Sequence, residues 1–183
     1  MILTVLVSAL VVPALTENAA AAQGHLQNAI KAYRSGFTAD SRDAFPGINL
    51  LTLLDAKGDD ASLREKDKLL PVVLYAVEQR LASRAPDYWD HATLLELAVL
   101  SKDKERAEQH AGDALAAMRE TWEAGTTLRN LRLIREARTA RKENISWLKD
   151  IEAAFAEASE EKKTTAEDSG ARTSKKKKTK IRN

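Results

Sequence analysis

The chain has 183 residues, 44% hydrophobic and 31% charged, which is typical of one soluble globular domain with tails, and its 5% of aromatic residues favours packed helices over a β-sandwich. The absence of cysteine excludes disulfides, thiolate zinc sites and cysteine nucleophiles. The net charge of +2 is unevenly distributed: nine basic and four acidic residues follow Ala158, whereas 20 basic and 23 acidic residues precede it. The folded part is therefore mildly acidic and shows no basic region typical of nucleic-acid binding.

The first segment, residues 1–22, is apolar. Met1–Leu15 is uncharged and Ala19–Ala22 offers small residues for cleavage, so a secretory signal peptide is one interpretation. No Lys or Arg precedes the apolar run, which is shorter than the roughly 20 residues of a membrane-spanning helix. A first buried helix and a start outside the functional domain are the alternatives. We expect a cytoplasmic protein, or an exported or membrane-associated one if this segment is a signal.

Residues 23–158 are predicted to form the folded domain. Apolar residues recur at helical spacing from Gln23 to Phe37, and Pro46 lies in the first turn of a second helix that ends near Gly58. Asp59 and Asp60 supply an N-cap for a third helix. Pro71 lies within this third helix and should split it or kink it sharply, because proline removes a backbone hydrogen bond.

The segment 87–118 predicts a helical hairpin. Two amphipathic runs flank the polar turn 101–105, and the second run places Ala107, Ala111 and Ala114 on one face. Because alanine is small, the two helices of the hairpin can lie close together, and Tyr88 and Trp89 are expected to fill the space at the open end of the hairpin. This pattern is typical of a tetratricopeptide unit, which needs flanking helix pairs to bury its apolar face.

The last part of the domain is predicted to contain two more helices. Residues 121–125 are predicted as a turn, with Thr126 or Thr127 capping a helix to about Arg141, and Asn144 capping a last helix. Residues 159–183 lack apolar periodicity and are predicted to be a disordered Lys-rich tail. The fold class is therefore all-α, a tetratricopeptide-like α-solenoid of about seven helices in antiparallel pairs.

Four stretches together resemble a known family. They are Arg42–Leu54, Leu69–Val73, Asp87–Ala98 and Thr127–Arg135. Their order resembles the TRAF-binding, tetratricopeptide-like region of the apoptosis signal-regulating kinases, especially its bacterial relatives. The resemblance implies a helical solenoid that binds other proteins, without catalytic residues of its own. In bacterial relatives such modules accompany signalling or conflict-system effectors. Because no kinase, NTPase or effector motif is found in the sequence, we expect an effector to act in trans.

An arginine stripe is the first candidate surface, and its members stand at steps of three on one helix. Such a stripe winds slowly beside the core face. Planar guanidinium groups could bind a carboxylate-rich protein or a phosphate-bearing ligand. The alternative is a solvated face, ion-paired with Glu123 and Glu136. The stripe consists of Arg129, Arg132, Arg135 and Arg138.

Two further candidates surround aromatic residues. Tyr88, Trp89 and His91, with the intervening Asp90, could form an exposed hot spot for a protein partner, although residues at a helix start are often core. Phe45–Asn49 could bind a ligand through the backbone near Gly47, or could be a tight turn between helices.

Other functional sites find little support in the sequence. His25, His91 and His110 stand far apart without metal-ligand spacing, so we assign no metal, and without a phosphate loop or hydrolase motif we expect neither a cofactor nor catalysis. The tail residues Lys175, Lys176, Lys177 and Lys178 could bind nucleic acid weakly or an anionic membrane, or could simply be a flexible tail.

The sequence thus favours a non-catalytic adaptor or scaffold that binds a signalling or effector protein. A sensor that binds a nucleotide-like anion on the arginine stripe is the alternative. A third hypothesis is an exported or anchored accessory protein that acts through its first fifteen residues.

Overall fold

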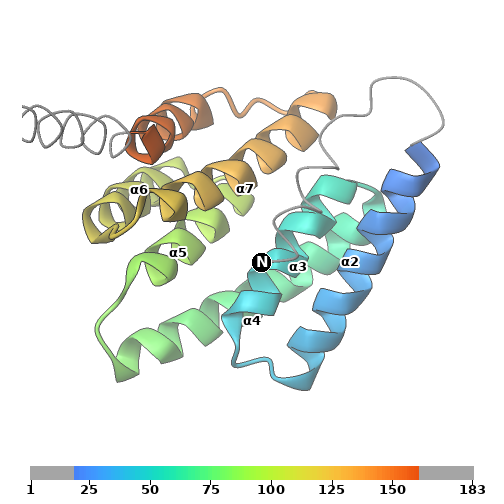
Figure 1. Ribbon diagram of the computed structural model, residues 1–183. Coiled ribbons are helices and arrows are strands. Elements are labelled where there is room, and N and C mark those ends of the chain that lie inside the picture. The colour runs from blue at the N-terminus through green and yellow to red at the C-terminus, as the bar shows by residue number, and fades with distance from the viewer. Residues whose placement is uncertain (1–18, 161–183) are drawn as a thin grey trace, which may run out of the picture.

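The computed structural model describes residues 19–160, which form seven helices and no strand (Figure 1). The all-helical class is confirmed. Of the helices in this described part, none is both long and apolar enough to cross a membrane. The predictions for Met1–Leu15 and for Lys175–Lys178 lie outside the described residues. The helices are α2 (Ala19–Ala39), α3 (Ala44–Lys57), α4 (Asp60–Ser83), α5 (Tyr88–Leu100), α6 (Lys104–Ala117), α7 (Thr121–Ala140) and a last helix over 148–160.

Helix α3 is the centre of the fold. It packs against α2, α4, α5 and α7, while α5 and α6 form the predicted hairpin. Figure 1 shows α2, α3 and α4 side by side in one half, with α5, α6, α7 and the last helix in the other. This position explains the composition of α3, in which nine of 14 residues are buried. Each fully buried leucine contributes roughly 1.5–3 kcal/mol through the hydrophobic effect.

The alanine face of the hairpin is confirmed. Ala107, Ala111 and Ala114 of α6 are 0%, 6% and 0% exposed and belong to the main hydrophobic core. Because alanine is small, α6 can lie close along α5, where Leu95 and Val99 are fully buried.

Aspartates begin four of the helices. Asp59, as predicted, accepts a backbone N–H group at the start of α4, and Asp87, Asp43 and Asp103 do so for α5, α3 and α6. Gly58 ends α3 in the left-handed conformation with φ of 72°, which glycine adopts without steric cost. The predicted cap at Gly58 is confirmed.

Of the two effects predicted for Pro71, the split of the helix is wrong, because α4 runs unbroken from Asp60 to Ser83. Pro71 and its neighbour Val72 lie on the exposed side of the helix. Water can therefore hydrogen-bond the carbonyl group that proline leaves without an N–H partner, and the core face formed by Val73 and Val77 stays intact.

The predicted turn at 121–125 is also wrong, because α7 begins at Thr121. The Oε2 atom of Glu123 accepts the backbone N–H of Glu120 at 2.9 Å and caps the helix start. Thr126 and Thr127, predicted as caps, lie inside the helix, where the Thr126 hydroxyl donates to a backbone carbonyl one turn earlier.

The last helix begins at residue 148, three residues later than predicted. Asn144 does not cap it. The Asn144 Oδ1 atom accepts hydrogen bonds from the Ser146 N–H at 3.3 Å and hydroxyl at 3.0 Å, which stabilise the preceding turn.

Phe45–Asn49 lies inside α3, so the predicted turn between helices is wrong. A Cβ atom at Gly47 would lie 2.7 Å from Val73 Cγ2 and 2.9 Å from Phe37 Cε2. Glycine is therefore needed here for the close approach of α3 to α2 and α4.

Candidate functional site

The arginine stripe is not a continuous surface. Arg138 is 1% exposed, and its guanidinium donates to both carboxylate oxygens of Asp55 at 3.0 Å. It also donates to the carbonyl oxygens of Val99 and Leu100 at the end of α5. Arg138 thus ties α7 to α3 and α5, and its prediction as a partner-binding residue on an exposed stripe is wrong.

Asp55 is the centre of a buried ionic cluster. Besides Arg138, the Lys66 ammonium lies 3.0 Å and the Arg141 guanidinium 3.1 Å from its carboxylate oxygens. Burial raises the Asp55 pKa, but the hydrogen bonds and charge of Arg138, together with the charge of Lys66, lower it below its usual range. The carboxylate therefore stays ionised and holds three cations in place.

A cavity of about 360 Å³ opens beside this cluster. The cations that line it already have carboxylate partners: Lys66 and Arg141 pair with Asp55, and Lys102 pairs with Glu143 at 2.8 Å. The cavity therefore presents a balanced set of charges rather than a cationic pocket for an anion.

The other three arginines of the stripe are engaged within the chain. Arg135 donates to Glu152 at 2.6 Å and lies 3.9 Å from Glu136, the partner predicted for the stripe. Arg132 lies 4.0 Å from Glu152, and Arg129 donates to the Thr126 hydroxyl at 2.9 Å. Glu123, also predicted as a partner, is instead 7% exposed and caps α7. The ion-paired interpretation describes these contacts better than an anion-binding face does.

Tyr88 is buried rather than part of an exposed hot spot. It is 2% exposed, and its hydroxyl lies 2.7 Å from that of Thr127 in α7. Burial raises the pKa of Tyr88 well above its ordinary value. Tyr88 therefore joins the start of α5 to α7 from within the core.

Trp89 and Trp122 form an exposed aromatic pair. Their ring centroids lie 5.6 Å apart, and they are 37% and 61% exposed. The interpretation of Trp89 as a core residue is wrong, because Tyr88 takes the inner position at this helix start. Trp89 rests edge-on against Tyr88, with centroids 5.0 Å apart.

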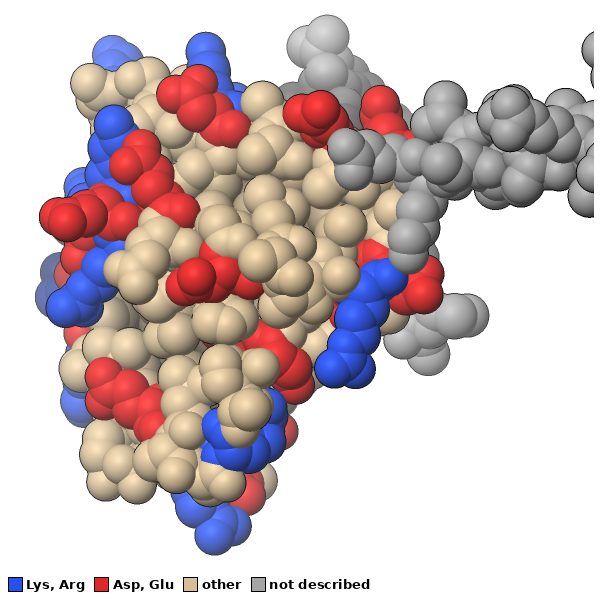
Figure 2. Space-filling view, turned by 90° about the vertical axis from the view of Figure 1, so that its left-hand side faces the viewer, with Lys and Arg blue, Asp and Glu red and all other residues tan. Residues whose placement is uncertain are grey.

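This pair lies at the end of the molecule where α5 and α7 begin, on the left of Figure 1. Figure 2 turns that end toward the viewer. Uncharged residues cover much of the middle of this face, separate acidic side chains lie among them, and basic side chains lie mostly toward its margins. The face therefore combines an aromatic pair with a partly acidic surrounding.

The backbone below the two tryptophans is fixed by capping contacts. The Asp87 carboxylate accepts the N–H groups of Trp89 and Asp90, and the Asp90 carboxylate accepts the N–H of Asp87. Asp90 is fully buried and pairs with Arg80 and Arg84 of the preceding segment. These contacts hold α5, and with it Trp89, in one position.

His91 and His110 are brought together, although the sequence analysis placed them far apart. Their Nδ1 atoms lie 3.8 Å and 3.7 Å from the same carboxylate oxygen of Asp113. Burial, the largest effect, lowers the pKa of His110. These three residues could hold a metal ion.

Two residues of this region were not predicted from the sequence. Trp122 was assigned to a turn, so its position beside Trp89 could not be expected. Glu96 was not singled out from the sequence; it is 6% exposed and accepts hydrogen bonds from Thr52 at 3.2 Å and Asn130 at 2.9 Å. Burial raises the pKa of Glu96 to about 7. No local sequence signal distinguishes it from a surface glutamate.

Comparison with known proteins identifies relatives. The family model described as MAP3K TRAFs-binding domain matches residues 3–155. Mitogen-activated protein kinase kinase kinase nsy-1 of Caenorhabditis elegans is 31% identical over 111 residues, which cover 60% of this chain and 7% of that protein. The chain thus spans a small fraction of the length of this curated relative. No solved structure matches the chain.

Proposed function

Because the chain belongs to the MAP3K TRAFs-binding domain family, a protein-interaction domain, we propose that it is a non-catalytic adaptor that binds a protein partner in a signalling or conflict-type complex. The face that carries Trp89 and Trp122 is the proposed contact surface. An effector activity then belongs to the partner, which acts in trans.

The exposure of the Trp89 and Trp122 pair is the observation that carries this proposal. Two indole rings in contact present a large apolar area to solvent, at 37% and 61% exposure. Tryptophan is enriched among the residues that dominate the binding energy of protein interfaces. The rings also keep N–H groups that can donate to a partner.

The pair is also held in place before binding. The Asp87 cap, the contact between Tyr88 and Thr127 and the Glu123 cap fix the first turns of α5 and α7. A preorganised surface loses less conformational entropy when a partner docks. This favours a defined contact face over a tryptophan pair exposed by chance.

The surrounding charges indicate the chemistry of the partner. The described face is mostly uncharged with separate acidic side chains (Figure 2), so it suits a protein with an apolar anchor flanked by basic groups. The family description names TRAF proteins as partners, and a TRAF-type protein is therefore the first candidate to test.

Affinity purification of the tagged full-length chain from its native host, followed by mass spectrometry, tests this function. The wild type, Trp122→Ala and Phe45→Ala are compared, because Phe45 is equally exposed at 62% but lies on α3. A partner retained by the wild type and Phe45→Ala but lost by folded Trp122→Ala supports the proposal. A partner retained equally by all three contradicts the proposed face.

A further inference from the structure

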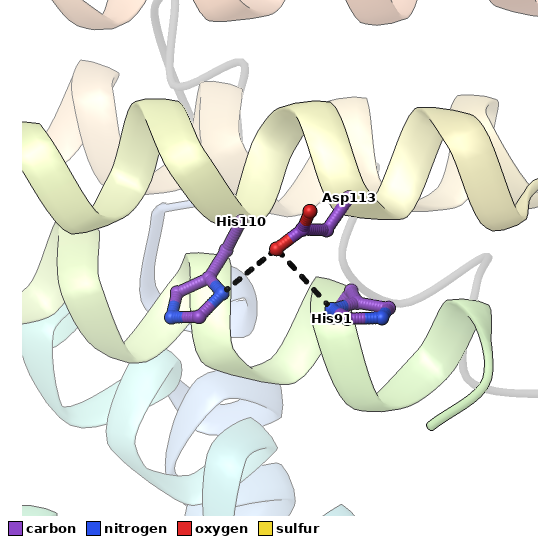
Figure 3. A group of neighbouring side chains, drawn as sticks. All are labelled: His91, His110 and Asp113. Atoms are coloured by element: carbon purple, nitrogen blue, oxygen red, sulfur yellow. Dashed lines mark ion pairs between the residues drawn. The ribbon is translucent and has the colours of Figure 1, made fainter. Parts of the chain in front are cut away.

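The α5–α6 hairpin brings two imidazoles and one carboxylate together. His91 projects from α5, while His110 and Asp113 stand one turn apart on α6, and the Asp113 carboxylate lies between the two rings (Figure 3). One ligand atom of each residue lies within 4.8 Å of those of the other two. The three side chains thus converge on one point from two helices.

The two nitrogen atoms that face Asp113 lack hydrogen bonds within residues 19–160. The Nδ1 atoms of His91 and His110 are buried and have no hydrogen-bond partner in this part of the chain. At 3.8 Å and 3.7 Å from Asp113 Oδ2, both are beyond hydrogen-bond distance. A buried polar atom without a partner is costly, which points to a group that these nitrogens bind.

We propose that His91 Nδ1, His110 Nδ1 and Asp113 Oδ2 form a binding site for a divalent transition-metal ion, with Zn²⁺ as the first candidate. Imidazole nitrogen and carboxylate oxygen are ligands that Zn²⁺ takes in proteins. At metal–ligand distances of about 2.0–2.2 Å, tetrahedral ligands lie about 3.4 Å apart. The two measured distances to Asp113 exceed this separation by only a few tenths of an ångström.

The exposure of the site fits three protein ligands and one exchangeable ligand. The side chains of His91 and His110 are 19% exposed and that of Asp113 is 44% exposed, so solvent reaches the cluster. Three protein ligands leave one tetrahedral position for water. The ion joins α5 to α6 and fixes the segment of α5 that carries Trp89, two residues before His91.

Isothermal titration of the untagged full-length chain with ZnCl₂ tests the site. We expect saturable binding of one Zn²⁺ per chain and a rise in the melting temperature that EDTA reverses. Asp113→Asn and His110→Gln should each weaken binding by at least about tenfold, because each removes one of three ligands. Circular dichroism establishes that the variants remain helical.

His25→Gln is the matched control, because His25 is the other histidine of the chain and lies on α2. It should bind one Zn²⁺ as tightly as the wild type. Cobalt provides a second measurement, since a Co²⁺-loaded site of this kind gives a visible absorption spectrum that the Asp113→Asn chain should lack. Absence of saturable binding by the wild type, or equal binding by folded His110→Gln and Asp113→Asn chains, would overturn the proposal.

Discussion

Arg138 and Asp55 stand 83 positions apart and form a two-bond ion pair in the core, with the Nε and Nη2 atoms of Arg138 each 3.0 Å from a carboxylate oxygen. The same guanidinium donates to the carbonyl groups of Val99 and Leu100, where α5 ends. A cation at a helix C-terminus is also favoured by the helix dipole. One side chain therefore joins α7, α3 and α5.

Arg138→Ala should strongly destabilise the domain. It removes four hydrogen bonds and leaves the Leu100 carbonyl group and part of the Asp55 carboxylate without this donor, while the Val99 carbonyl group keeps only the Lys102 N–H. Breaking such a buried pair costs about 3–5 kcal/mol. Urea unfolding followed by circular dichroism measures the loss. Arg132→Ala, at a half-exposed side chain, should change the free energy of unfolding by less than about 0.5 kcal/mol. Equal effects of the two substitutions would contradict the structural role of Arg138.

Glu96 should make stability depend on pH. Burial raises its pKa from 4.5 to about 7, so the folded protein binds this proton more tightly than the unfolded chain does. The stabilisation is fully present below pH 4.5 and is lost as the pH rises through 7. Glu96→Gln keeps acceptor and donor groups for Asn130 and Thr52 but cannot ionise.

The measurement is the free energy of unfolding of both proteins from pH 4.5 to 8. Relative to the wild type, the free energy of unfolding of Glu96→Gln should increase with rising pH, by on the order of 1–3 kcal/mol at pH 8. A difference between the two proteins that stays constant over this range would show that Glu96 does not titrate as described.

Gly47→Ala should destabilise the packing of α3 against α2 and α4. Its Cβ atom would lie within 3.0 Å of both Val73 and Phe37, and overpacking of this kind costs about 1–3 kcal/mol, partly offset by the higher helix propensity of alanine. Gly112→Ala is the control, since a Cβ atom there meets nothing within 4 Å. Gly112→Ala should stabilise α6 by about 0.5–1 kcal/mol. In thermal unfolding, the melting temperature should fall for Gly47→Ala and rise for Gly112→Ala. A shift of both melting temperatures in the same direction would contradict the packing described.

Much of the fold follows from local chemistry and could be predicted. The alanine spacing of α6 predicted the hairpin, and Asp59 and Gly58 predicted helix ends, because these effects act within a few residues of the chain. The turn predicted at residues 121–125 was wrong, because the Glu123 side chain caps α7 from inside the helix.

The candidate functional site was harder to predict than the fold, because its residues are placed by tertiary contacts. Spacing placed Arg138 on the same stripe as Arg132, but only the position of Asp55, 83 residues away, explains its burial. His91 and His110 meet because α6 folds back along α5, a register that the hairpin prediction did not specify. Tyr88 and Trp89 are adjacent, and the packing of α7 decides which of them is buried.

We expect the Trp89 and Trp122 pair to form the contact surface for a protein partner. The most direct test is calorimetric titration of the purified captured partner into the wild type, the Trp89→Ala/Trp122→Ala double variant and the Phe45→Ala/Tyr75→Ala double variant. Phe45 and Tyr75 are exposed to 62% and 60% and therefore match the loss of aromatic surface. We predict that the tryptophan variant binds at least about a hundredfold more weakly, a loss of at least about 2.7 kcal/mol, whereas the control binds like the wild type. Unchanged affinity of the folded tryptophan variant would contradict this prediction, whatever the control shows.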